Sequence, residues 1–128
     1  MPGPRRAGAV VFARDLESLS RFYQEVFGLR LVTADATRHV IESDDIQLVM
    51  HAIPAHIAAT FTIATPPERR DEAAIKLFFT VPSLTAAEAT AKALGGDVFG
   101  AEWQGPGFRA RDGYDPEGNV FQLRESVS

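Results

Sequence analysis

The sequence contains no cysteine among its 128 residues, and this absence excludes several kinds of chemistry. Disulfide bonds, thiolate nucleophiles and cysteine-ligated zinc are all ruled out. Histidine is also scarce, and no two of the three histidines lie two or four residues apart. A metal-binding histidine pair within one strand or one helix is therefore not expected.

An excess of positive charge and long apolar segments are lacking as well. The formal net charge is -4, so no overall basic field favours nucleic acid or an anionic membrane surface. The apolar run after Arg5 and Arg6 is too short for a signal peptide, and no segment approaches the roughly 20 apolar residues that cross a bilayer. We therefore expect a cytoplasmic protein that binds neither nucleic acid nor membranes.

The first half of the chain reads as a strand, a helix and three further strands. The apolar run Gly8–Ala13 predicts a buried strand. Asp15 is suited to cap a helix whose apolar residues recur at helical spacing, and Gly28 is placed to end it. Three more strands are predicted at residues 29–32, 39–42 and 46–51.

The second half repeats this order. A strand is predicted at residues 76–81, Ser83 caps a helix that Gly95 and Gly96 end, and three strands follow around Val98, at 108–111 and at 120–124. The interval from cap to terminal glycine is the same in both halves. We therefore predict an α+β fold made of two tandem βαβββ modules in one domain. The modules span residues 7–52 and 75–126, and a connector spans 53–74.

A tight turn near the C-terminus completes the pattern. Asp115 opens it, Pro116 and Gly118 suit a type I geometry, and a strand follows. Together with Asp15-Leu16-Glu17 leading to Phe22-Tyr23, and with Phe27-Gly28-Leu29, this turn resembles the vicinal oxygen chelate superfamily. That superfamily contains glyoxalase I, bleomycin resistance proteins and extradiol dioxygenases. The resemblance implies two modules whose strands form a curled sheet around a shared cavity, commonly in a homodimer.

The resemblance also implies where a metal would bind. Metal-using members hold one divalent ion with four side chains, from the first and last strands of each module. Those positions fall on Gly8, Gln47, Lys76 and Gln122. A divalent cation needs deprotonated donors, whereas this set offers no side chain, an ammonium group and two neutral amides. We therefore predict no metal and no other cofactor.

Strand alternation predicts what lines the cavity instead. Val10 and Phe12 share a face with Gly8, Phe78 with Lys76, and Arg124 with Gln122. Trp103, in a stretch predicted to lie between strands, either stacks on a ligand or covers a sheet edge. Arg109 and Arg111 are further candidates for an anion site. The predicted ligand-binding residues are Lys76, Gln122, Gln47, Phe12, Phe78, Trp103 and Arg124. The alternative is that the phenylalanines fill a core.

Three functions remain open. The first is a metal-free protein, comparable to the bleomycin resistance proteins, that binds a small organic molecule, with an anionic ligand as one option. The second is a glyoxalase-like lyase or isomerase, or a dioxygenase, using a metal held by other groups or a desolvated Lys76 as base or nucleophile. The third is an interaction module that assembles through the connector. If the connector does not mediate assembly, it is a mobile lid or an inert solvated segment. A homodimer is expected from the resemblance.

Overall fold

The computed structural model describes residues 5–127 and contains the predicted βαβββ order twice. The first module holds β1 (Gly8–Ala13), α1 (Leu16–Phe27), β2 (Arg30–Ala34), β3 (Arg38–Glu42) and β4 (Gln47–Ala52). After a short helix α2 (Ala55–Ala58), the second module holds β5 (Leu77–Thr80), α3 (Leu84–Ala93), β6 (Asp97–Gly105), β7 (Phe108–Tyr114) and β8 (Val120–Ser126). The α+β prediction is confirmed.

Each module forms its own sheet. Sheet A has the strand order β1-β4-β3-β2 and sheet B the order β5-β8-β7-β6. The first and last strands of each module are parallel, and the remaining pairs are antiparallel. Over residues 5–127 the two sheets share no strand pairing and neither closes into a barrel, so β1 and β5 are both edge strands.

The helices begin and end where the sequence indicates. The Asp15 carboxylate accepts a hydrogen bond from the Ser18 backbone N–H at 3.2 Å, and the Ser83 hydroxyl accepts one from Ala86 N–H at 3.1 Å. Both side chains satisfy an N–H that has no partner within the helix. Gly28 ends α1 with φ at 69°, in the left-handed region that favours glycine.

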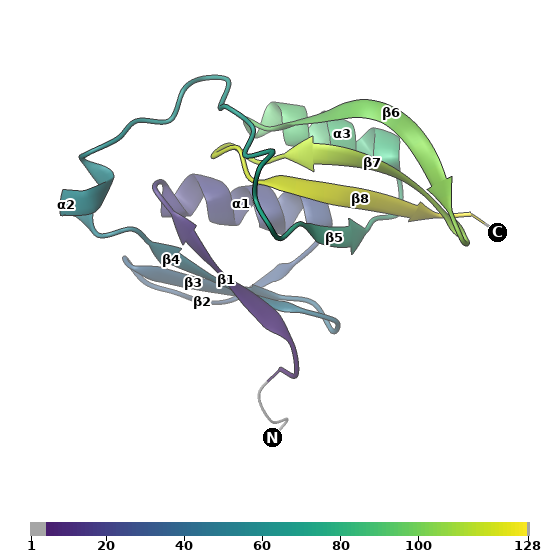
Figure 1. Cartoon of the computed structure of the whole chain (residues 1–128). Coiled ribbons are helices and arrows are strands. Elements are labelled where there is room, and N and C mark those ends of the chain that lie inside the picture. The colour runs from purple at the N-terminus through teal and green to yellow at the C-terminus, as the bar shows by residue number, and fades with distance from the viewer. Residues whose placement is uncertain (1–4, 128) are drawn as a thin grey trace.

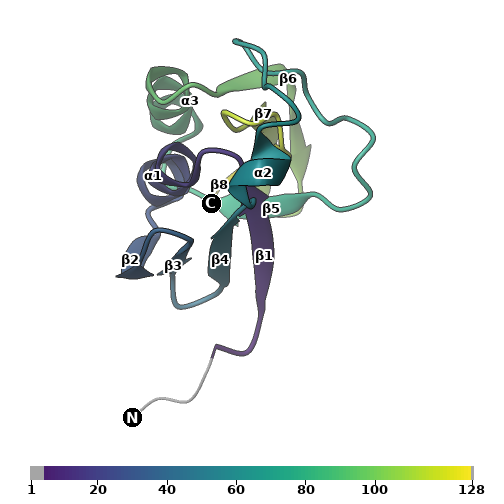
Figure 2. The same cartoon turned by 90° about the vertical axis from the view of Figure 1, so that its left-hand side faces the viewer.

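Helix α1 packs against both modules and supplies much of the core. Figure 1 shows it above sheet A, and Figure 2 shows α1 and α3 side by side on the same side of the molecule. Phe27 at its end stacks on Phe79 of β5 at 4.1 Å between ring centroids, and Phe22 meets Phe121 of β8. We call the sheet surface turned toward the helices the helix face, and the opposite surface the open face.

The turn at residues 115–119 ties the second module to the first. The buried Asp115 carboxylate accepts hydrogen bonds from the Tyr23 hydroxyl at 2.8 Å and from backbone and side chain groups of the turn. Glu117 accepts from the backbone N–H groups of Arg14 and Asp15 at 2.8 and 2.9 Å. The turn therefore holds the junction between β1 and α1.

The connector crosses this same turn, as Figure 1 shows for the segment leading to β5. Arg70 N–H donates to the Gly118 carbonyl at 2.8 Å, and its guanidinium donates to the Glu117 carbonyl at 3.3 Å. Gly118 has φ at 85°, and a Cβ there would overlap the Glu68 carbonyl oxygen. Glycine is thus required where the two segments meet. Within the chain the connector acts as a strap over the turn.

The prediction that Trp103 lies between strands is wrong, because strand β6 continues through it to Gly105. The pairing of β6 with β7 shifts register between Phe99 and Trp103, and Gly100 within the shift has φ at 77°. A bulge with a left-handed glycine lets a strand continue past a sequence that resembles a loop. No helix among the described residues is long and apolar enough to cross a membrane.

Candidate functional site

The residues predicted to line a cavity lie on the open faces of the two sheets. In sheet A, Gly8 pairs with Gln47 and Phe12 with His51. In sheet B, Phe78 pairs with Gln122. Several apolar side chains on these faces are exposed in the single chain: Val10 by 59%, Phe12 by 62%, Phe78 by 55% and Trp103 by 44%. They are therefore not core-filling residues here.

The open face of sheet A carries a closed cluster of charges around Glu42. Its carboxylate accepts hydrogen bonds from Arg5 at 2.6 and 3.0 Å, from Arg30 at 3.2 Å and from the Gln47 amide at 2.9 Å. The bond from Arg5, followed by the bond from Gln47, lowers the Glu42 pKa to about 2. Glu42 was missed from sequence, although its place opposite Gln47 across the predicted hairpin was a usable signal.

The open face of sheet B carries an aromatic cluster around Arg124. The guanidinium carbon lies 3.7 Å from the ring centroid of Phe78 and 4.2 Å from that of Phe108. Its Nε donates to the Gln122 amide oxygen at 2.6 Å. Trp103 contacts Phe108 edge to face at 5.6 Å. Four predicted residues therefore share one surface, and Phe108 joins them as a residue that sequence analysis did not select.

Lys76 lies beside the aromatic cluster, and its ammonium is ion-paired rather than free. Its ammonium is 3.1 Å from Asp112 Oδ2, and its side chain is 43% exposed. Asp112 pairs across the strands with Gln122. Because the ammonium is ion-paired and solvated, the apolar surroundings that a reactive lysine needs are absent.

Arg109 and Arg111 point to the other face of sheet B, so the suggestion that they join an anion site is wrong. Arg109 pairs with Glu125 at 2.7 Å and Arg111 with Glu88 at 3.2 Å. Alternation explains this placement, since neighbours in β7 such as Asp112 occupy the open face.

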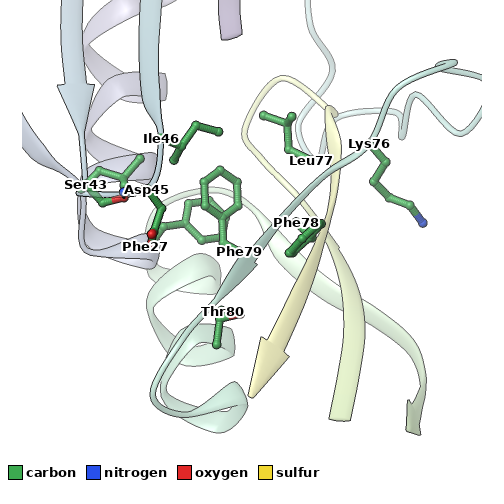
Figure 3. Close-up of a pocket in the computed structure, with 10 residues that line it drawn as sticks. Phe27, Ser43, Asp45, Ile46, Lys76, Leu77, Phe78, Phe79 and Thr80 are labelled. Atoms are coloured by element: carbon green, nitrogen blue, oxygen red, sulfur yellow. The ribbon is translucent and has the colours of Figure 1, made fainter. Parts of the chain in front are cut away.

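A crevice of about 490 Å³ lies between the modules along the outer edge of β5 (Figure 3). One wall comes from the turn before β4, with Ser43, Asp45 and Ile46. The other comes from β5, and Figure 3 shows Phe27 and Phe79 between the walls and the Lys76 ammonium pointing away from the turn. The crevice is mainly apolar, and neither Gln122 nor Arg124 lines it. The hydrogen-bonding groups of the candidate site therefore lie on the open face beside it.

A buried histidine cluster was also missed. His39, on the helix face of sheet A, has Nδ1 2.7 Å from the Ser20 hydroxyl and Nε2 3.4 Å from a Glu17 carboxylate oxygen. The trio has the composition of a hydrolase triad, but Ser20 is fully buried, so no substrate reaches its hydroxyl. The remaining histidine in a strand, His51, packs against Phe12 and donates to the Ala52 carbonyl.

The four superfamily metal positions do not fit a divalent ion. A Cβ at Gly8 would overlap the Gln47 carbonyl oxygen, so a ligating side chain cannot be placed there unless the strand moves. Lys76 is ion-paired, and both glutamines are engaged by neighbouring side chains. Within residues 5–127 no three histidine, aspartate or glutamate side chains gather as a metal site would require. These four positions therefore do not offer the deprotonated donors that a divalent ion requires.

Comparison with known proteins agrees with the fold. The Glyoxalase-like domain family matches residues 8–124, and no curated protein matches the chain. One solved structure that is similar is a glyoxalase/bleomycin resistance protein/dioxygenase family enzyme from Burkholderia phytofirmans PsJN, with 21% identity, a TM-score of 0.70, and coverage of 94% of this chain and 98% of that one.

Two further similar structures have lower scores. The fosfomycin resistance protein FosX from Mesorhizobium loti has 18% identity and a TM-score of 0.64, covering 99% of this chain and 95% of its own. A glyoxalase/bleomycin resistance protein from Albidiferax ferrireducens T118 has 19% identity and a TM-score of 0.66, covering 94% and 98%. At these identities the structures share the fold alone. The family match, which covers nearly the whole chain, shows that this protein belongs to the glyoxalase-like family of the vicinal oxygen chelate superfamily.

Proposed function

We propose that this protein binds a small organic molecule without a metal, in the manner of a bleomycin resistance protein rather than of a glyoxalase. The proposal rests on the contrast between the four superfamily metal positions and the open face of sheet B. The metal positions offer no anionic donor, whereas the open face of sheet B brings aromatic rings together with a guanidinium and an amide. Ligand pockets typically combine apolar walls with a few placed polar groups.

A second copy of the chain would cover the open faces and so enclose the ligand. The exposed apolar residues lie on the open faces, where a single chain leaves them in water. The edge strands β1 and β5 are unpaired on their outer sides over residues 5–127. Both features support a homodimer in which open faces of the two copies enclose the ligand.

Metal analysis and ligand binding test the function together. Purified protein should contain far less than one equivalent of zinc, iron, nickel or manganese per chain, and EDTA should leave its melting temperature unchanged. In a thermal-shift screen of small acids and planar aromatic compounds, those that bind should raise the melting temperature, because a ligand that binds only the folded state stabilises it. One tightly held transition metal per chain would instead support the lyase, isomerase or dioxygenase alternative.

The homodimer has its own test. Phe12→Glu places a charge on the open face of sheet A without touching the core, so it should convert a dimer into a monomer in sedimentation velocity. Ile57→Glu, at an exposed site on α2, is the matched control and should leave the mass unchanged. A monomeric wild-type protein, or a Phe12→Glu dimer of unchanged stability, would contradict the assembly.

A further inference from the structure

We propose that the ligand is a small aromatic carboxylate that also carries a hydrogen-bond donor. Its carboxylate would bind Arg124 and Gln122, its ring would lie against the aromatic cluster, and its donor would reach Asp112. This inference rests on the proposed function and names the class of molecule that the site takes.

The first observation is an unneutralised cation. Within residues 5–127, no carboxylate lies at ion-pair distance from Arg124, and only Nε of its donors has an acceptor. The rings of Phe78, on β5, and Phe108, on β7, contact the guanidinium from the strands on either side of β8, and its two terminal nitrogens have no acceptor among the described residues. A guanidinium edge matches a carboxylate with two parallel hydrogen bonds.

Gln122 extends this donor edge. Its Oε1 accepts from Arg124, so its amide nitrogen is left as a donor with no acceptor among the described residues. Arg124 also holds this amide in one orientation, because a guanidinium only donates. The two residues, alternate in β8, therefore present N–H groups to a single anion.

The second observation is an unsatisfied acceptor. Asp112 Oδ1 is buried without a hydrogen-bond partner in the described part of the chain, although Oδ2 binds Lys76. A buried carboxylate oxygen without a donor is costly. Because the Asp112 side chain as a whole is 29% exposed, a rotation of its carboxylate would present that oxygen to a hydroxyl or amino group of the ligand. Asp112 is the diagonal neighbour of Arg124 across β7 and β8, and such neighbours lie roughly 7–8 Å apart. Both side chains are therefore within reach of a single small ligand.

The aromatic residues favour a planar molecule over an aliphatic one. Phe78 and Trp103 are both about half exposed on this face, and Trp103 is held edge to face by Phe108. Ring faces that are exposed and fixed in orientation stack well on another ring. Lys76, the cation expected from sequence to hold an anion, is offset by Asp112, so Arg124 takes that role.

The first experiment measures benzoate and benzyl alcohol by NMR titration of the wild-type protein and three variants. Arg124→Gln should weaken benzoate about tenfold or more, the loss expected for hydrogen bonds to a charged group, and should change benzyl alcohol by less than about twofold. Arg124→Lys should restore part of the benzoate affinity. Arg21→Gln, which removes an exposed arginine from α1, is the matched control and should bind like wild type.

The second experiment compares 4-hydroxybenzoate with benzoate. Wild type should prefer the hydroxylated acid about fivefold or more, and Asp112→Leu, which is close in size but has no acceptor, should abolish that preference. An unchanged preference in Asp112→Leu would overturn the role of Asp112. Heteronuclear spectra that superimpose away from sheet B establish that each variant is folded.

The outcomes separate the two proposals. The carboxylate inference fails, while the small-molecule function stands, if neutral aromatic compounds bind as well as acids. It also fails if Arg124→Gln weakens the binding of benzoate and benzyl alcohol equally. If no compound in the thermal-shift screen or the titrations binds, the proposed function fails with it.

Discussion

The bond between Glu117 and the start of α1 gives the sharpest structural prediction. Glu117 belongs to the second module, is 5% exposed, and accepts the backbone N–H groups of Arg14 and Asp15 with separate carboxylate oxygens. It is thus an anionic acceptor at a helix N-terminus, where negative charge is favoured. Replacing it by glutamine keeps the shape but turns one acceptor oxygen into a donor.

The magnitude follows from the two bonds. One backbone N–H then faces an amide N–H, and a buried donor left unsatisfied costs about 1–3 kcal/mol. The other bond loses its charge assistance, about half its strength. We expect Glu117→Gln to lower the free energy of unfolding by about 3 kcal/mol, which for a domain of this size lowers the melting temperature by about 10 °C.

Urea denaturation followed by circular dichroism measures this change. Glu25→Gln is the matched control, because it removes a carboxylate from an exposed i,i+4 ion pair on α1 and should cost less than about 0.5 kcal/mol. A Glu117→Gln protein within about 0.5 kcal/mol of wild type would refute the reasoning, because the turn would then not hold the two modules together.

Three other substitutions test particular contacts. Ionised Glu42 stabilises the folded chain above its ordinary pKa of 4.5, and this contribution is lost as the pH falls toward the folded value of about 2; Glu42→Gln should therefore flatten stability against pH in that window, and an unchanged slope would contradict the cluster. Gly8→Ala should cost about 1–3 kcal/mol in urea denaturation because its Cβ overlaps the Gln47 carbonyl, and a neutral effect would reopen position 8 to a metal ligand. Tyr23→Phe should cost about 1–3 kcal/mol by removing the hydroxyl from buried Asp115; burial, the largest cause, raises the pKa of both groups, and stability equal to wild type would show that Asp115 is satisfied without the hydroxyl.

The fold could be predicted from local signals because each of them has a local cause. Asp15 and Ser83 cap helices through bonds within three residues, and Gly28 ends α1 through its own backbone angle. The stretch around Trp103 misled because Gly100 and Gly105 resemble loop residues. A bulge at Gly100 keeps the strand going, and only the pairing with β7 reveals it.

Only the part of the candidate site that lies within a single strand could be predicted from the sequence. Alternation along β8 correctly groups Gln122 with Arg124, since it depends on one strand. Their partners Asp112 and Phe108 come from β7, and their positions depend on a register that no single strand encodes. The same limit hid the contact between Ser20 and His39, which joins a helix to a strand.

The distribution of charge over the open face of sheet B explains why Arg124 should govern ligand choice there. On sheet A, Arg5 and Arg30 are offset by Glu42, and Arg30 also by Asp44 at 3.6 Å. On sheet B, Asp112 offsets Lys76, which leaves the Arg124 charge without a counterpart among residues 5–127. In the proposed site the positive charge belongs to the chain itself rather than to a bound divalent ion. Anion binding should therefore be insensitive to chelators and weaken with salt, because screening acts on a partly exposed charge. Replacing Arg124 should change which ligands bind more than whether any ligand binds.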